Sequence, residues 1–265
     1  MRRNQLMWGV VLLLVGVLML ANSLGIRLPN GKSFMDLFWP LILILLGGWI
    51  LFGIFFRGTT KSEEVSIDLQ GAREASLKLS HGAGEFRVHS GAGVNEYIHA
   101  MITGGVEQKV NRDGDKLDVK LRPTQEIMSF PMIGPSNQLD WDVAINANIP
   151  TALKLNLGAN KSIIDLHDLN ITDLKLETGA SETQLTLPSK GRFHADLDFG
   201  AASLSITVPD GLSARIKASL GAASINVDES RFPRSSGYYQ SPDYDTAVNA
   251  ADITIDAGAA SINIK

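Results

Sequence analysis

The sequence predicts a membrane-anchored all-β protein, in which an N-terminal two-helix transmembrane hairpin precedes a β-solenoid or two-layer β-roll with 21-residue repeats. Three observations lead to this fold class. Two long apolar stretches without a charged residue lie within residues 1–58. A Gly-Ala motif then recurs every 21 residues, and between its copies apolar residues alternate with polar ones. Such alternation is typical of half-buried β-strands.

The two apolar stretches occupy residues 6–24 and 37–56. As helices they would be about 28 Å and 30 Å long, which matches the hydrocarbon thickness of a bilayer. Pro29-Asn30-Gly31 supplies a turn between them. The alternative is a cleaved signal peptide ending at Ala21-Asn22-Ser23, but the first stretch is longer than such a peptide requires and a second span follows. We therefore expect a hairpin over residues 1–58 in a multi-pass protein of the cell membrane.

Basic residues near the spans predict the orientation of the chain. The terminal side carries five of them and the loop between the spans carries two, namely Arg2, Arg3, Arg57, Lys61 and Arg73 against Arg27 and Lys32. Because cytoplasmic flanks are enriched in Lys and Arg, both termini are expected inside. This places the β-domain in the cytoplasm.

The chain after residue 57 is acidic, with 19 basic and 27 acidic residues and a formal net charge of −8. Nucleic acids and anionic lipids bind basic surfaces, so this composition argues against both as ligands of the β-domain. The chain has no cysteine. Disulfides, thiolate nucleophiles and cysteine-ligated metal sites are therefore excluded.

The repeat is carried by five glycines. Their spacings are 21, 21, 21 and 37 residues, in the order Gly158, Gly179, Gly200, Gly221 and Gly258. The excess of 16 residues before the last copy indicates an insertion at about residues 230–246. Each glycine is predicted to form a corner between two short strands, where it permits either a positive φ or the close approach of a neighbouring coil. Stacked repeats would bury a common core, with Gly200 and Gly221 at the corners of adjacent coils.

Residues 62–265 are expected to form one repetitive all-β domain, with the regular repeats over about 150–265. Its first part is less regular but also alternates, and an isolated copy of the glycine motif stands at His81-Gly82-Ala83-Gly84. The alternation predicts strands at residues 65–69, 75–79, 117–121 and 141–145, and a hairpin turn at 111–115.

No motif in the chain assembles a catalytic site. The five histidines, His81, His89, His99, His167 and His194, form no metal-binding pair and accompany no nucleophile elbow. They are interpreted as solvated residues of turns and strand faces. Gly82-Ala83-Gly84 and Gly91-Ala92-Gly93 resemble phosphate loops, but no helix follows them. We therefore expect no catalytic residue, no metal and no cofactor, and the chain is not predicted to be an enzyme.

Two apolar or aromatic loops interrupt the alternation. Residues 123–138 contain Phe130 and Met132, and residues 231–246 contain Tyr238 and Tyr239. One interpretation is that they cap an open edge of the β-stack, which repeat proteins require. The other is that these four residues dock a partner protein, since aromatic residues and Met are enriched at such surfaces.

The arrangement resembles the LiaF-like cell-envelope stress proteins of bacteria, which join a membrane segment to a β-domain called the cell-wall-active antibiotic response domain. The resemblance is carried by Trp39-Pro40-Leu41-Ile42-Leu43-Ile44-Leu45-Leu46-Gly47-Gly48, by Ile164-Asp165-Leu166, and by Leu176, Gly179 and Leu185-Thr186-Leu187-Pro188. It implies a non-enzymatic modulator of envelope-stress signalling that restrains a membrane histidine kinase. It carries over no catalytic residue.

Two other functions stay open at this point. One is a structural or adhesin-like β-solenoid scaffold that assembles end to end as a homo-oligomer, which an uncapped terminal coil would favour. The other is a membrane-bound hydrolase, which a convergent polar pocket with a shifted titratable residue would favour.

Overall fold

The computed structural model describes residues 62–124 and 139–265, together with Gly16, Leu20, Ser23 and Leu43, each of which is helical. The predicted spans and the loop residues Phe130 and Met132 therefore fall outside the described residues, apart from those four positions. Within the described part of the chain, no helix combines the length and apolarity needed to cross a membrane.

The described β-residues form one 14-stranded sheet, so the predicted all-β class is confirmed. The strands are β1 (Ser62–Asp68), β2 (Glu74–Ser90), β3 (Glu96–Thr103), β4 (Val106–Asp113), β5 (Lys116–Pro123), β6 (Trp141–Ile145), β7 (Thr151–Asp165), β8 (Ile171–Thr186), β9 (Arg192–Thr207), β10 (Ser213–Leu220), β11 (Ser224–Val227), β12 (Arg234–Ser235), β13 (Tyr238–Gln240) and β14 (Ala250–Ile264).

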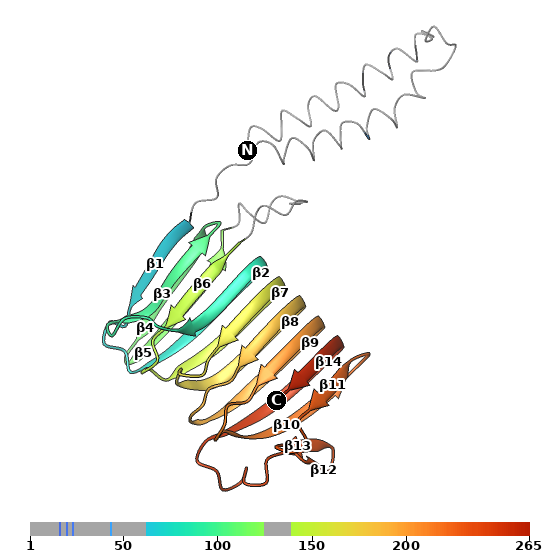
Figure 1. Ribbon diagram of the computed structural model, residues 1–265. Coiled ribbons are helices and arrows are strands. Elements are labelled where there is room, and N and C mark those ends of the chain that lie inside the picture. The colour runs from blue at the N-terminus through green and yellow to red at the C-terminus, as the bar shows by residue number, and fades with distance from the viewer. Residues whose placement is uncertain (1–15, 17–19, 21–22, 24–42, 44–61, 125–138) are drawn as a thin grey trace. The chain divides into compact units, whose positions relative to one another are not determined.

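The centre of the sheet is a ladder of five long parallel strands, β2, β7, β8, β9 and β14 (Figure 1). Their register follows the sequence repeat, because Leu153 pairs with Leu174 and Leu174 pairs with Ala195. Equivalent apolar residues therefore stand side by side in continuous rows.

The long strands must bend, because their connections are short. A straight 15-residue strand would span about 50 Å, whereas β7 and β8 are joined by residues 166–170 and β8 and β9 by residues 187–191. Parallel strands normally need a crossover of a dozen or more residues. Here the second half of each strand runs back toward the start of the next and serves as that crossover.

The bend lies at the Gly-Ala motif and is visible in the burial pattern. In β7 the odd-numbered residues from Thr151 to Leu157 are buried, but after Gly158 and Ala159 the even-numbered residues Asn160, Ser162 and Ile164 are buried. The residues that face the core are therefore odd-numbered before the corner and even-numbered after it. We expected two short strands separated by this corner, whereas backbone pairing continues through it in β7, β8, β9 and β14.

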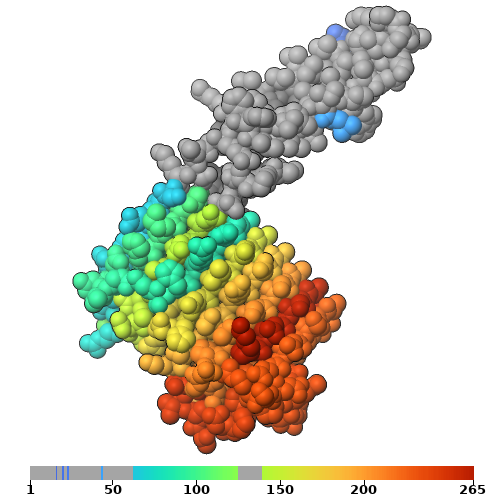
Figure 2. Space-filling model, in the orientation of Figure 1, coloured from blue at the N-terminus to red at the C-terminus, as the bar shows by residue number. Residues whose placement is uncertain are grey.

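The order of the last two repeats differs from the expectation. β14, which carries the fifth copy, pairs with β9 on one side and with β10 and β11 on the other, so the fourth copy is displaced to the end of the stack. Figure 2 shows the red of β14 between the orange of its two neighbours. The prediction that Gly200 and Gly221 lie on adjacent units is therefore wrong.

The two copies differ little in the side chains that they turn inward. Ile253 and Ile262 of β14 stand beside Ile216 and Ile225 of the fourth copy, and Ile255 beside Ala218 is offset by Ala257 beside Leu220. Side-chain composition therefore does not explain the exchange. The chain can make it because the inserted residues 228–249 provide a connection long enough to reach the interior position.

The first strands extend the ladder at its other end. β5 and β6 pair with the two halves of β2, and each is followed outward by an antiparallel neighbour, β4 beside β5 and β3 beside β6. β1 then pairs with β3. The strands predicted at residues 65–69, 75–79, 117–121 and 141–145 are confirmed, as is the β4–β5 hairpin turn at Gly114, whose φ is +58°.

Candidate functional site

The repeat glycines form a single row across the stack, which we call the glycine file: Gly82, Gly158, Gly179, Gly200, Gly258 and Gly221. The five from Gly158 onward have no positive φ. What each one requires is space. A Cβ atom on Gly158 would lie 2.1 Å from the carbonyl oxygen of Gly82, and one on Gly200 would lie 2.8 Å from that of Gly179. Of the two roles expected for these glycines, close approach of neighbouring units is the one that the geometry supports.

The outer surface beside the glycine file is a shallow depression of about 440 Å³ whose polar lining includes Asn156, Glu177 and Asp198. Its central carboxylate is fully partnered. Glu177 accepts hydrogen bonds from Lys154 Nζ at 3.0 Å and from Asn156 Nδ2 at 2.8 Å. The bond from Lys154, with help from Lys175, lowers the pKa of Glu177 despite partial burial. These contacts neutralise the surface and point to a structural ladder of charges.

The second predicted loop packs against the edge of the stack. β13 pairs with β10, with Tyr239 opposite Ile216, and β12 pairs with β13. Arg215 holds the loop by hydrogen bonds to Gln240 Oε1 at 2.6 Å and Asp245 Oδ1 at 3.0 Å, and its guanidinium lies 4.2 Å from the centroid of Tyr244.

Within this loop, Phe232 and Tyr244 are buried, while Tyr238 and Tyr239 stay half-buried. The loop thus covers the first half of the outer edge of β10. Tyr239 packs against the core, and Tyr238 is the member of the pair that is not part of the core contact. Phe130 and Met132, the other two predicted docking residues, lie outside the described residues.

The histidines do not converge on a reactive group. His167 Nδ1 is 2.7 Å from Asp168 Oδ1 at an exposed turn, and His89 Nε2 is 2.8 Å from Asp142 Oδ1. Partial burial disfavours the charged form of His89, but hydrogen bonds to the Ser90 carbonyl and to Asp142 outweigh it and raise the pKa of His89. Across the described ranges, no group of three or more His, Asp or Glu side chains could hold a metal ion.

His81 contradicts the expectation of a solvated residue, because only 3% of it is exposed. Its ring lies between Phe86 and Trp141, with centroid distances of 5.4 and 5.2 Å, and Nε2 is 2.7 Å from the Leu139 carbonyl oxygen. Nδ1 contacts the buried amide of Asn160. Burial lowers the pKa of His81 to about 4, so the ring is neutral at pH 7. It is a core residue with satisfied ring nitrogens.

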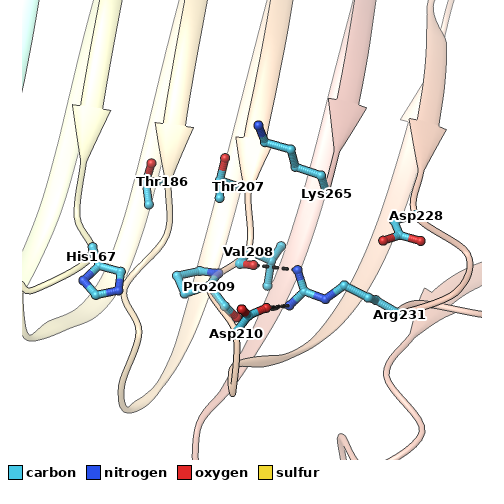
Figure 3. Close-up of a pocket in the computed structure, with 9 residues that line it drawn as sticks. All are labelled: His167, Thr186, Thr207, Val208, Pro209, Asp210, Asp228, Arg231 and Lys265. Atoms are coloured by element: carbon cyan, nitrogen blue, oxygen red, sulfur yellow. Dashed lines mark hydrogen bonds and ion pairs between the residues drawn. The ribbon is translucent and has the colours of Figure 1, made fainter.

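An open depression of about 540 Å³ lies where the strands end, beside the turns (Figure 3). Thr186 and Thr207 stand on its wall at equivalent repeat positions, and His167 lies at its rim. Arg231 closes one side by donating hydrogen bonds to the carbonyl oxygens of Val208 at 2.8 Å and Pro209 at 3.1 Å. Because the His167 ring bonds to Asp168 and not to a hydroxyl, the lining does not form a nucleophile with its base.

Comparison with protein families separates the chain into two matches. Residues 6–51 match the LiaI-LiaF-like transmembrane region. Residues 56–207, more than half of the chain, match the N-terminal domain of toast_rack, DUF2154. The chain belongs to the toast_rack N-terminal domain family. Together the two matches confirm the predicted LiaF-like resemblance and support a membrane location, and neither toast_rack nor the LiaF-like group is a known enzyme family.

A solved structure resembles the β-domain of this chain in fold. A candidate cell-adhesion protein from Clostridium sporogenes ATCC 15579 aligns with a TM-score of 0.70 and 21% identity, over 78% of this chain and 99% of that protein. A candidate adhesin from Bacteroides fragilis NCTC 9343 aligns over 77% of this chain and 97% of that protein, with 9% identity and a TM-score of 0.31. The first similarity concerns the fold alone, and the second is too low to support an argument. No curated protein matches the sequence.

Proposed function

We propose that this chain is a non-enzymatic membrane protein that modulates cell-envelope stress signalling by protein contact and restrains a membrane histidine kinase. The observation that carries the proposal is the union of a LiaI-LiaF-like membrane region with a toast_rack domain in one chain. The geometry is consistent with it, because Glu177 and His167, which line the two depressions, bond to neighbouring Lys154 and Asp168 and are not paired with a nucleophile among the described residues.

The proposed arrangement assigns residues 1–58 to a two-span anchor and residues 62–265 to a cytoplasmic β-solenoid with 21-residue coils. The solenoid interpretation is supported by the short connections and by the bend at each Gly-Ala motif. An anchor in the same membrane as the partner would confine both proteins to two dimensions and raise their effective concentration. A weak contact would then suffice for regulation.

Contact with the partner is assigned to Phe130, Met132, Tyr238 and Tyr239. In cells carrying an envelope-stress reporter, the double variant Phe130→Ser/Met132→Ser should release the reporter to the level of a deletion strain. The matched variant Phe130→Leu/Met132→Leu keeps the apolar surface and should still repress. Tyr238→Ser should weaken repression, whereas Tyr238→Phe should preserve it.

The same reporter separates contact from catalysis. His89→Ala and His167→Ala remove exposed or half-exposed imidazoles that pair only with neighbouring groups. Both should repress normally at wild-type protein levels. Full repression by the Ser variants combined with its loss in the histidine variants would overturn the proposal and favour a hydrolase.

A scaffold is the second proposed function, and one feature of the sheet favours it. Beyond β11 no other described strand completes the stack. An uncapped edge of this kind is suited to end-to-end assembly.

A further inference from the structure

The last repeat unit of the stack has a partly open edge, which we call the terminal edge and define as residues 217–228. β13 covers the outer side of β10 only at Arg215 and Ile216. Beyond these two residues, β10 and β11 pair only with β14 among the described residues. Figure 1 shows β11 at the margin of the ribbon with β14 on its inner side.

The terminal edge is apolar on its inward face. Ala218, Leu220, Ala223 and Ile225 pack against the core but are only partly buried. The residues of β14 at the same four positions, Ile255, Ala257, Ala260 and Ile262, are at most 9% exposed. The terminal edge is thus a unit of the stack that lacks its next neighbour. Sheet edges of this kind pair readily with another strand unless charge, proline or a bulge blocks them.

Backbone direction identifies the groups that are available for pairing. Ser213 donates its amide hydrogen toward β14, at Asn249, while Ala214 bonds to Ser241 on the opposite side. The backbone N–H and C=O groups of the even-numbered residues of β10 therefore face away from β14, because the backbone groups of alternate residues in a strand face opposite neighbours. After the corner the odd-numbered residues have the outward backbone groups, since the amide of the even-numbered Asp228 donates to the carbonyl oxygen of Ile264 in β14. Among the described residues, the backbone groups without a partner strand are those of Ala218 and Leu220 on β10 and of Ile225 and Val227 on β11.

We propose that the terminal edge binds the terminal edge of a second copy of this chain, antiparallel and around a twofold axis. With the axis between Ala222 and Ala223, Leu220 of one copy lies opposite Ile225 of the other, and Ala218 lies opposite Val227. These are the four residues with free backbone groups, so the two strands would exchange about eight hydrogen bonds. The inward apolar residues of both copies would meet in one core.

Charge and shape both support this register. Lys217, the exposed cation at one end of the edge, would lie opposite Asp228 at the other end. A shift by two residues in one direction would place a strand on Arg215 and Ile216, which β13 already occupies. A shift in the other direction separates Lys217 from Asp228. The corner is also compatible, because a twofold axis through it exchanges the half-strand before the glycine with the half-strand after it.

A second copy fits the edge because one twofold rotation pairs the four residues with outward backbone groups and also pairs Lys217 with Asp228. An isologous contact requires that the same patch serve on both sides. The opposite end of the stack would not serve equally well. β1, its outermost strand, carries the exposed Glu63 and Glu64, and such charges are a common protection against edge pairing.

Disulfide trapping in native membranes tests the register, because the natural chain has no cysteine. Ser219 and Asn226 are exposed and would lie opposite each other in a non-hydrogen-bonded pair, with Cα atoms about 4.5 Å apart. That distance suits a disulfide. Two differently tagged copies, one with Ser219→Cys and one with Asn226→Cys, should form a crosslinked heterodimer on mild oxidation, and neither variant alone should crosslink.

The matched control uses the same positions of an interior unit. Asp198 and Ser205 of β9 correspond to Ser219 and Asn226 through β14, but β9 has strands on both sides. The pair Asp198→Cys and Ser205→Cys should give no heterodimer. Lys217→Glu should lower the yield of the Ser219/Asn226 crosslink several-fold, while Lys217→Arg should retain it.

Three results would overturn the dimer. They are no crosslink from the Ser219/Asn226 pair, an equal yield from the interior pair, or efficient crosslinking of Ser219→Cys with itself. The first result would mean that the terminal edge pairs with another strand or faces solvent. The third result would indicate a different register. The kinase proposal is tested by the reporter and does not depend on any of these outcomes.

Discussion

Adding one methyl group at successive positions of the glycine file tests whether close approach between units is what these glycines supply. The substitution is Gly→Ala, and the structure gives a different clearance at each site. A Cβ on Gly82 meets nothing within 4 Å, whereas one on Gly179 lies 3.1 Å from the Gly158 carbonyl oxygen. The clearance falls to 2.8 Å at Gly200 and 2.1 Å at Gly158. In each close case the obstacle is backbone, which cannot rotate away.

The magnitudes follow from two opposing effects. Alanine reduces the entropy of the unfolded chain and stabilises by about 0.4–1 kcal/mol where its backbone conformation is allowed. Overpacking of a tight interior costs about 1–3 kcal/mol. Gly82→Ala should therefore be neutral or slightly stabilising, and Gly179→Ala should change the free energy of unfolding by less than about 1 kcal/mol. Gly200→Ala should lose about 1–3 kcal/mol, and Gly158→Ala should lose more than Gly200→Ala.

Thermal melts of the detergent-solubilised full chain, followed by circular dichroism of the β-sheet signal, measure this series. For a protein of this size, 1 kcal/mol corresponds to about 2–4 °C in Tm. Tm should decrease in the order Gly82→Ala, Gly179→Ala, Gly200→Ala and Gly158→Ala. If Gly158→Ala melts together with Gly82→Ala, steric contact is not the reason for the glycines.

Three further predictions concern other parts of the molecule. The pKa of His81 is about 4 in the fold against 6.5 for the free side chain. The stabilisation from the neutral ring is therefore present above pH 6.5 and is lost as pH falls toward 4. In urea melts, the stability advantage of wild type over His81→Gln should shrink by about 3 kcal/mol between pH 7 and pH 4. Arg215→Met removes the bonds to Gln240 and Asp245 and should speed proteolysis within residues 228–249, whereas Lys217→Met should not. Ser235→Cys, at an exposed position, should resist a membrane-impermeant thiol reagent in intact cells and react after lysis; labelling in intact cells would place the β-domain outside.

The repeat spacing predicted the ladder because equal spacing and in-register pairing have the same cause. Residues 21 apart occupy equivalent environments, so Leu153, Leu174 and Ala195 form one row. The same alternation could have located His81, since it continues the inward series of Leu77 and Leu79. Reading residue type in place of position led to the expectation of a solvated imidazole.

The position of β14 could not be read from spacing. An interval of 37 residues fixes the register of the last copy, but the last copy could pair with either side of the fourth copy. The inward side chains do not decide between them either, because Ile255 in place of Ala218 is offset by Ala257 in place of Leu220. Tyr238 is a different case, because it is not part of the core contact, and a side chain of that kind contributes little to the fold and leaves no periodic signal.

Placing the fourth repeat at the end of the stack has a physical consequence for assembly. Any interior unit is held by two neighbours, whereas the terminal unit is held by one and leaves its inward side chains half covered. A capping hairpin could have covered the whole edge, yet β13 stops after Ile216 and the chain returns to build β14 inside. The uncovered remainder, residues 217–228, is the segment in which apolar residues, free backbone groups and opposite charges match under a twofold rotation. Backbone pairing and burial of inward apolar side chains, which build the domain from parallel units, would therefore also join two copies of it through an antiparallel contact.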